Sequence, residues 1–108
     1  MRKIDIRDYH YEVIDSEGKS KEFPYSVKSN LIAVLFQRQL NLSAIELLGR
    51  DDLARKIRDC ESDEILLEES EYEEIKKAVN AFRGYGKQDI EFVKRVLECP
   101  KIEVEEKK

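Results

Sequence analysis

The stretch from Ser62 to Pro100 constrains the fold more than any other part of this chain. It contains a short apolar run, Ile65-Leu66-Leu67, and then two amphipathic segments joined by Arg83-Gly84-Tyr85-Gly86-Lys87. Apolar residues recur at helical spacing in both segments, and Pro100 ends the second because proline cannot continue a helix. The pattern predicts a strand over residues 64–68 followed by an αα-hairpin with an aromatic tip.

The first helix of this hairpin has the stronger signal. Ser70 and Glu73 have the spacing of a capping box, which predicts that the helix begins after Ser70. Gly84 stands where a left-handed residue would end it, and we expect Tyr85 to pack back across the turn. Lys87 or Gln88 then opens the second helix. The apolar stripes of the two helices are Tyr72, Ile75, Val79 and Phe82, and Ile90, Val93, Val96 and Leu97.

The N-terminal segment predicts a β-hairpin. Ile4 and Ile6 begin an alternating pattern that resumes at Tyr9 with its phase shifted by one, which indicates a bulge or bend near Asp8. The segment Asp15-Ser16-Glu17-Gly18 has the composition of a turn, with a glycine available for positive φ. One face of the predicted hairpin is aromatic and consists of Tyr9, Tyr11, Phe23 and Tyr25.

The middle of the chain predicts short helices. Ser29 or Asn30 can cap the first, and Ser43 with Glu46 forms a capping box for the next. Gly49 then interrupts the helical pattern, and we expect a break there, followed by a further short helix. One longer helix through Gly49 is the alternative, at a cost of about 1 kcal/mol relative to alanine.

These patterns together predict a single compact α+β domain over residues 1–108. Its order is an N-terminal β-hairpin, short middle helices and a C-terminal strand–αα-hairpin–strand unit, with a final strand at Ile102 to Val104 and a frayed tail at 105–108. The predicted core consists of Val13, Phe23, Val27, Leu31, Leu35, Leu47, Leu53, Ile57, Leu66, Ile75, Val79, Phe82, Val93 and Leu97.

Charge is distributed unevenly along the chain, whose formal net charge is −4. Residues 1–60 contain 11 Lys/Arg and 10 Asp/Glu, whereas residues 61–108 contain 9 and 14. Eight acidic residues and no basic one lie between Glu61 and Glu74. Such a segment repels phosphate backbones and attracts basic surfaces. It is either a solvated helix start beside a charged strand edge or a surface on which a partner docks.

Catalytic groups are sparse in this sequence. His10 is the only histidine, and it lies between two tyrosines on the opposite face of the predicted strand, which favours an ordinary surface histidine. Neither cysteine has a histidine nearby in sequence, and motifs such as Gly-x-Ser-x-Gly are missing. With 24 acidic residues a pair of catalytic carboxylates is possible, but nothing singles out two of them. We expect a protein that is not an enzyme and that uses no small-molecule substrate or cofactor.

Cys60 and Cys99 stand far apart in the sequence, and zinc needs about four ligands in close geometry. We therefore expect no metal site and two free, buried or half-buried thiols in a reducing compartment, although a disulfide between them is the alternative. No apolar run approaches the ~20 residues of a membrane span. These features predict a cytoplasmic location and no membrane partner.

A nucleic-acid-binding function is the alternative hypothesis. Residues 43–58 can be interpreted as a helix-turn-helix in which Gly49 lies in the turn. The sequence pI of about 5.2, and Asp51 and Asp52 at the start of the second helix, argue against it. The Tyr85 turn, which has the composition to stack a base, would enlarge such a surface. Its basic residues would be Arg50, Arg55, Lys56 and Arg58.

One set of residues in the last third to half of the chain forms a pattern of its own: Ile65-Leu66-Leu67-Glu68, Glu71-Tyr72, Ile75-Lys76, Ala78-Val79, Phe82, Gly84-Tyr85-Gly86, Asp89 and Val93-x-Arg95-Val96-Leu97-Glu98. In these residues the chain resembles small proteins of phage and prophage gene sets. Some proteins of that group are encoded among virion-assembly genes. The resemblance implies an assembly, regulatory or structural part that works by contact, in the cytoplasm or in the virion, and it identifies no binding residues.

The leading hypothesis is accordingly a protein-binding or self-assembling module that forms homo-oligomers. Its contact features are the aromatic hairpin, where Pro24 marks an edge strand, and the acidic segment. The predicted interaction residues are Tyr9, Tyr11, Tyr25, Glu68, Glu69 and Tyr85.

Overall fold

The alternating segment at the N-terminus forms two strands that belong to different sheets. In the computed structural model, which describes residues 1–101, β1 (Arg2–Asp5) pairs antiparallel with β4 (Glu64–Leu67). The next strand, β2 (Tyr9–Ile14), pairs antiparallel with β3 (Ser20–Tyr25). The irregularity predicted near Asp8 is therefore a break between strands, and residues 6–8 connect the two sheets.

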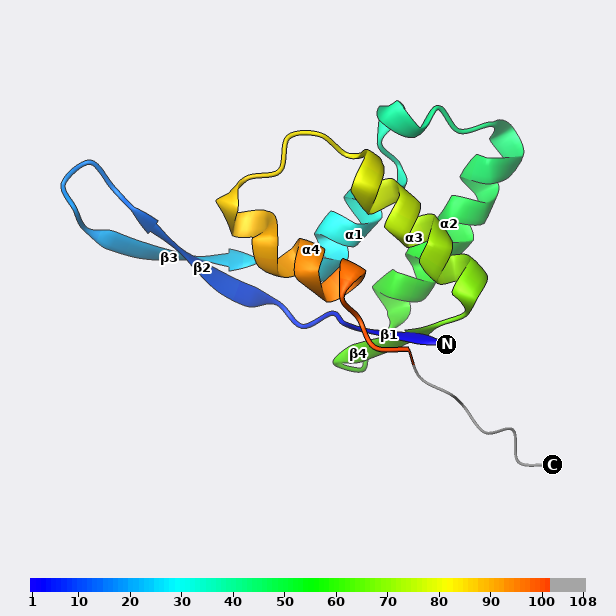
Figure 1. Cartoon of the computed structure of the whole chain (residues 1–108), viewed down its shortest axis with the longest axis horizontal. Coiled ribbons are helices and arrows are strands. Elements are labelled where there is room, and N and C mark those ends of the chain that lie inside the picture. Colours follow the sequence, from blue (N-terminus) through cyan, green and yellow to red (C-terminus); the bar gives the residue numbers. More distant parts are fainter. Residues whose placement is uncertain (102–108) are drawn as a thin grey trace.

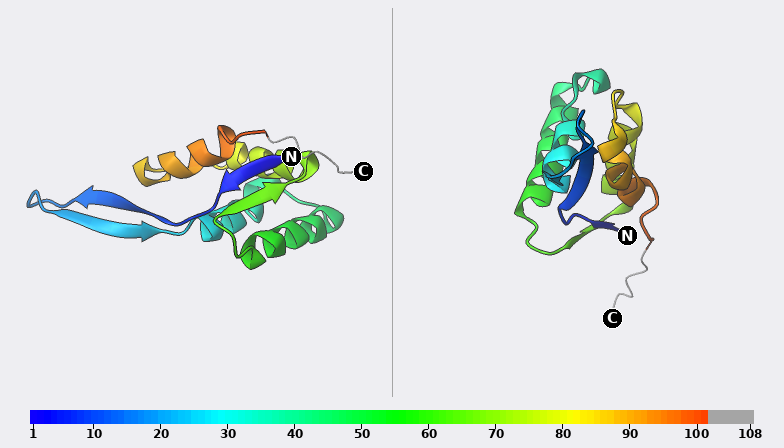
Figure 2. Two further views of the ribbon diagram at one scale, coloured as in Figure 1. Left: turned by 90° about the horizontal axis from the view of Figure 1, so that it is seen from below. Right: turned by 90° about the vertical axis from the view of Figure 1, so that its left-hand side faces the viewer.

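The β2–β3 hairpin projects from the helical body as an arm (Figures 1 and 2). Its turn follows the sequence prediction, with Gly18 at φ +78° and the Gly18 N–H donating to the carbonyl of Asp15 at 3.0 Å. The carboxylate of Asp15 also accepts from the N–H groups of Glu17 and Lys19, at 2.9 Å each. The arm contributes to the longest dimension of the molecule, which measures 60 × 35 × 22 Å.

The first helix, α1 (Val27–Leu35), begins earlier than predicted. Its N-cap is Ser26, whose hydroxyl accepts from the N–H of Ser29 at 3.3 Å, so neither Ser29 nor Asn30 caps it. Strand β3 runs almost directly into this helix, which leaves Ser26 as the residue at the junction. A 3₁₀ turn, η1 (Arg38–Leu40), follows.

The second helix, α2 (Ala44–Asp59), is continuous, so the predicted break at Gly49 is wrong. The predicted capping box is confirmed, because Glu46 N–H donates to Ser43 Oγ at 3.2 Å and Ser43 N–H donates to Glu46 Oε1 at 3.3 Å. The helix continues because its buried stripe, which includes Leu53 and Ile57, packs in the core. That packing outweighs the cost of about 1 kcal/mol for a glycine within a helix.

Gly49→Ala is therefore expected to stabilise the protein by about 0.5–1 kcal/mol, because a helical glycine gives up backbone entropy for no contact. A Cβ added at Gly49 meets no atom within 4 Å. Gly18→Ala is the matched control and should destabilise the protein, since Gly18 has a φ of +78° that alanine disfavours. Urea denaturation of both variants measures the two effects. A loss of stability in Gly49→Ala would contradict the prediction.

The C-terminal half forms the predicted αα-hairpin. Its helices are α3 (Glu69–Ala81) and α4 (Ile90–Leu97), and a 3₁₀ turn, η2 (Lys87–Asp89), opens the second as predicted. The capping box lies two residues earlier than Ser70–Glu73, at Glu68 and Glu71, where Glu68 N–H donates to Glu71 Oε1 at 2.9 Å. Strand β4 already ends at Leu67, so Ser70 falls inside the first helical turn.

The tip of this αα-hairpin folds back on the first helix as predicted. The hydroxyl of Tyr85 donates to the carbonyl of Val79 at 2.8 Å, and its ring lies 4.8 Å from that of Phe82. Gly84 has the expected positive φ, at +113°. It does not follow the helix directly, because α3 ends at Ala81 and the C-cap Phe82 is extended.

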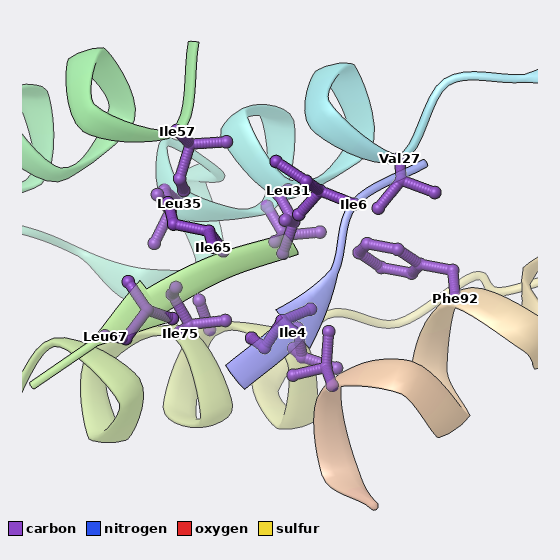
Figure 3. Packing of buried hydrophobic residues seen from close by; sticks show 14 of the residues in the cluster. Ile4, Ile6, Val27, Leu31, Leu35, Ile57, Ile65, Leu67, Ile75 and Phe92 are labelled. Atoms are coloured by element: carbon purple, nitrogen blue, oxygen red, sulfur yellow. The ribbon is translucent and has the colours of Figure 1, made fainter. Parts of the chain in front are cut away.

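The core lies between the helices and the β1–β4 sheet. The helices cover one face of this sheet, which lies below α2 and α4 in Figure 1 and in the right-hand view of Figure 2. Side chains from both strands and from all four helices of residues 1–101 meet there, and Figure 3 shows Ile4, Leu31 and Phe92 among them. The fold class is α+β, as predicted. None of the helices in residues 1–101 has the length and apolarity that crossing a membrane requires.

Five predicted core residues are instead substantially exposed. Val13 and Phe23 lie on the arm, while Leu47 lies on the solvent side of α2. Leu66 points outward because its neighbours in β4 point inward, and Leu97 lies at the end of α4. The fully buried residues missing from the predicted core include Ile4, Leu67, Tyr72, Phe92 and Val96.

The predicted last strand at Ile102 to Val104 and the predicted frayed tail lie outside the described residues. Just before them, Lys101 forms an antiparallel bridge with Arg2, and Lys3 N–H donates to the carbonyl of Pro100 at 3.3 Å. The chain thus reaches β1 at its unpaired edge.

Candidate interaction surface

The root of the arm is fixed to the body by two tyrosines. Tyr9 and Tyr25 are paired across the strands, and their rings stack at 4.5 Å with 12° between the planes. The hydroxyl of Tyr25 donates to Asp89 Oδ1 at 2.5 Å, and that of Tyr9 donates to the carbonyl of Gln88 at 2.6 Å. The Tyr9 hydroxyl also accepts from the N–H of Phe92 at 3.2 Å.

Both tyrosines are held neutral by their surroundings. Burial raises the pKa of Tyr25 strongly, and its bond to the Asp89 carboxylate raises it further. Burial also raises the pKa of Tyr9. The guanidinium of Arg95 lies 5.0 Å from the centre of the Tyr9 ring, within the range of a cation–π contact. These contacts hold the arm at a fixed angle to the body.

Beyond the root, the aromatic face of the arm is open to solvent. The ring of Tyr11 stacks on that of Phe23 at 5.8 Å, and Val13 follows Tyr11 on the same face opposite Lys21. Phe23 is 41% exposed, Val13 is 43% exposed and Ile14, on the other face, is 70% exposed. A groove of about 640 Å³ separates this part of the arm from η2, and Tyr11, Glu12, Val13, Ile14, Lys87 and Gln88 line it.

A second apolar surface lies at the start of α2. Ile45 is 84% exposed and Leu48 is 68% exposed. Because residues three apart in a helix are neighbours, the two side chains form a continuous stripe. Figure 1 places this end of α2 opposite the tip of the arm along the longest axis of the molecule. Sequence reasoning missed the stripe, although Ile45 within the capping box Ser43–Glu46 is a visible signal of an apolar residue at a helix start.

The predicted interaction residues do not form one surface. Tyr25 is buried and Tyr9 half-buried at the root of the arm, so of the three hairpin tyrosines only Tyr11 lies on the open face. Tyr85 is half-buried at the tip of the αα-hairpin. Glu68 and Glu69 lie at the junction of β4 and α3, in the body of the molecule.

The acidic segment is partly neutralised by cations from elsewhere in the chain. Lys3 Nζ lies 2.7 Å from Glu64, and Arg2 Nε lies 3.4 Å from Glu69, whose carboxylate also faces the N-terminal amino group at 3.8 Å. Lys56 Nζ lies 2.7 Å from Glu71. These ion pairs reduce the negative electrostatic field of the segment, so it is less suited to docking a basic partner.

The helix-turn-helix interpretation of residues 43–58 is wrong, because this segment is one helix. Arg50 is 5% exposed, and its guanidinium donates to the carbonyl of Glu74 at 2.9 Å, so it holds α2 against α3. The other basic residues face nearby carboxylates: Arg55 with Asp51 at 3.0 Å, Lys56 with Glu71 at 2.7 Å and Arg58 with Asp59 at 2.8 Å.

The reactive side chains lie apart. His10 is exposed opposite Pro24 on the outer face of the arm, as predicted for a surface histidine. The expectation of free thiols is confirmed, with Cys60 half-buried and Cys99 buried. Cys60 lines a polar hollow of about 720 Å³ with residues of both charges, including Arg7 and Asp59. Within residues 1–101, no group of His, Cys, Asp or Glu is arranged to hold a metal ion.

Comparison with known proteins adds no family. No protein-family model matches the chain, and neither a curated protein nor a solved structure matches it.

Proposed function

We propose that this protein is a non-enzymatic protein-binding or self-assembling module whose contact element is the β2–β3 arm. The observation that supports this most directly is the exposure of Val13, Ile14 and Phe23 on an arm that is anchored at its root. Burying one such side chain completely is worth about 1.5–3 kcal/mol. A two-stranded hairpin is also only marginally stable in water by itself, and its outer backbone edges are unpaired. A partner that packed against the arm would stabilise it and cover those edges.

The non-enzymatic part of the proposal rests on the position of His10, which is exposed on the arm and lines a different hollow from Cys60. The resemblance of residues 65–98 to phage and prophage proteins suggests virion assembly as the setting, which would place the protein in the cytoplasm or in the virion. An exposed apolar arm suits that role, because assembly proteins join by surfaces that are exposed only before assembly.

The test uses an arm variant, Val13→Glu/Phe23→Thr. The glutamate would face Lys21 across the hairpin, and threonine favours strands, so the arm should keep its fold. We expect the native protein to self-associate or to retain a protein from an extract of its host, and the arm variant to lose that contact. Light scattering after size exclusion, and affinity capture followed by mass spectrometry, measure the two outcomes.

His10→Thr is the matched control, because it changes an exposed residue on the opposite face of the same strand. It should behave like the native protein in both measurements. A native protein that stays monomeric and retains nothing that the arm variant loses would contradict the proposed function.

A further inference from the structure

We propose that the open face of the arm of one copy docks on the stripe at the start of α2 of a second copy, so that copies join head to tail. This deepens the proposed function by naming the partner. We call the first surface the arm face (Val13, Lys21, Phe23) and the second the α2 stripe (Ile45, Leu48, Asp52). Asp52 belongs to this stripe because it follows Leu48 by four residues.

The two surfaces have complementary chemistry. Each presents exposed apolar side chains beside one charged residue, Lys21 on the arm face and Asp52 on the α2 stripe. Within residues 1–101, neither Lys21 nor Asp52 takes part in an ion pair, in contrast to Lys3, Lys56 and Asp51. One contact between copies would therefore bury both apolar surfaces and pair both charges.

The spacing of the residues also matches. Phe23 and Lys21 lie two positions apart on one face of a strand, a separation of about 6.6 Å. Leu48 and Asp52 lie four positions apart on a helix, a rise of about 6 Å. Phe23 can therefore contact Leu48 while Lys21 reaches Asp52. Gly49, beside Leu48 on the outer side of the helix, adds no side chain that would hold the arm away.

A symmetric contact between two arms fits these observations less well. It would place Lys21 of each copy against the other arm face, and it would leave Ile45 and Leu48 in water. The arm tip and the start of α2 also lie at opposite ends of the long axis (Figure 1). Two copies joined by unlike surfaces still have one free arm face and one free α2 stripe. Such a contact therefore generates a ring or an open chain rather than a closed dimer.

The test mixes two variants that each lack one surface. The arm variant, Val13→Glu/Phe23→Thr, retains the α2 stripe, and a stripe variant, Ile45→Glu/Leu48→Gln, retains the arm. Both changes of the stripe variant are at exposed helical positions, so circular dichroism should show an unchanged fold. We expect the native protein to form species larger than dimers, each variant alone to be monomeric, and the mixture to form dimers.

Nuclear magnetic resonance identifies the residues through which the two mixed variants contact each other. Unlabelled arm variant added to isotope-labelled stripe variant should shift the amide signals of residues 11–23 of the labelled protein. Leu47→Gln is the control for the stripe variant, because Leu47 is an exposed leucine of the same helical turn but points away from the stripe. It should assemble like the native protein.

Charge exchange tests the proposed ion pair. Lys21→Glu and Asp52→Lys should each weaken association about three- to tenfold, and the double variant Lys21→Glu/Asp52→Lys should restore it.

Two outcomes would overturn the head-to-tail contact. If the native protein is oligomeric but the mixture of the arm variant and the stripe variant stays monomeric, the contact joins like surfaces, and the proposed function remains intact. A native protein that is monomeric at all concentrations would also overturn it, and the proposed function would then depend on the capture of a host protein by the arm.

Discussion

Phe92→Ala is expected to lower the free energy of unfolding by about 3–5 kcal/mol, the usual cost of removing a buried aromatic ring. The Phe92 side chain is fully buried, and its ring centre lies 5.9 Å from that of Tyr25. Its backbone N–H donates to the Tyr9 hydroxyl. The substitution therefore opens a cavity at the point where the arm joins the body. Urea denaturation followed by circular dichroism measures the loss.

Phe23→Ala is the matched control for this prediction. Phe23 is 41% exposed and its ring contacts that of Tyr11, so its removal leaves no enclosed cavity. We expect it to cost less than about 1 kcal/mol, in the range of surface substitutions and exposed ring pairs. Equal losses for the two phenylalanines would contradict the assignment of Phe92 to the core and of Phe23 to an open surface.

These two phenylalanines also show where sequence reasoning reaches its limit. Alternation correctly placed Phe23 in a strand, and the second amphipathic segment correctly predicted the helix that contains Phe92. Periodicity does not show whether a face meets the core or projects from it, because the same pattern arises in both cases. The arm projects since β1 pairs with β4, and a pairing between strands so far apart in sequence leaves no local signal.

Local sequence patterns predicted the structure correctly where few alternative positions fitted the same pattern. The Ser43–Glu46 capping box and the turn at Gly18 both have the predicted geometry. At α3, by contrast, two pairs with capping-box spacing lie close together, and the end of β4 at Leu67 decides in favour of the earlier one. At Gly49 the local preference for a break is outweighed by the packing of α2 in the core.

The candidate surface was predictable only in part. The aromatic character of the arm is evident from alternation, whereas the burial of Tyr25 depends on Asp89, a residue 64 positions away. The neutralisation of the acidic segment depends on Lys3 and Lys56, which reach it through the sheet and through the contact of α2 with α3. Such distant partners are set by tertiary structure, which composition does not reveal.

Alkaline pH is expected to destabilise the protein steeply above about pH 10, where tyrosine ionises in an unfolded chain. Burial raises the pKa of Tyr72 and of Tyr85 to about 12 each, and it raises that of Tyr25 still further. All three hydroxyls donate hydrogen bonds, to the Val96 carbonyl, the Val79 carbonyl and Asp89. The folded protein therefore keeps protons that the unfolded chain has released.

The direction of this pH dependence follows from the linkage between folding and proton binding. Each of these tyrosines contributes its full stability below pH 10, and the contribution is lost as the pH rises toward the pKa of the folded state. Between pH 9 and pH 11 the three together should lower the free energy of unfolding by about 4 kcal/mol. Urea denaturation at intervals of pH, followed by far-ultraviolet circular dichroism, measures this dependence.

Tyr25→Phe tests the assignment to particular side chains. The variant loses the hydrogen bond to Asp89 and should be less stable at neutral pH, where Tyr25 is still protonated in both states. Its stability should also fall less steeply above pH 10, by about 1.4 kcal/mol per pH unit, because one titrating group has been removed. Unchanged slopes in the native protein and the variant would show that Tyr25 ionises as readily in the folded state as in the unfolded chain. In that case Tyr25 would not be the buried anchor that fixes the arm to the body.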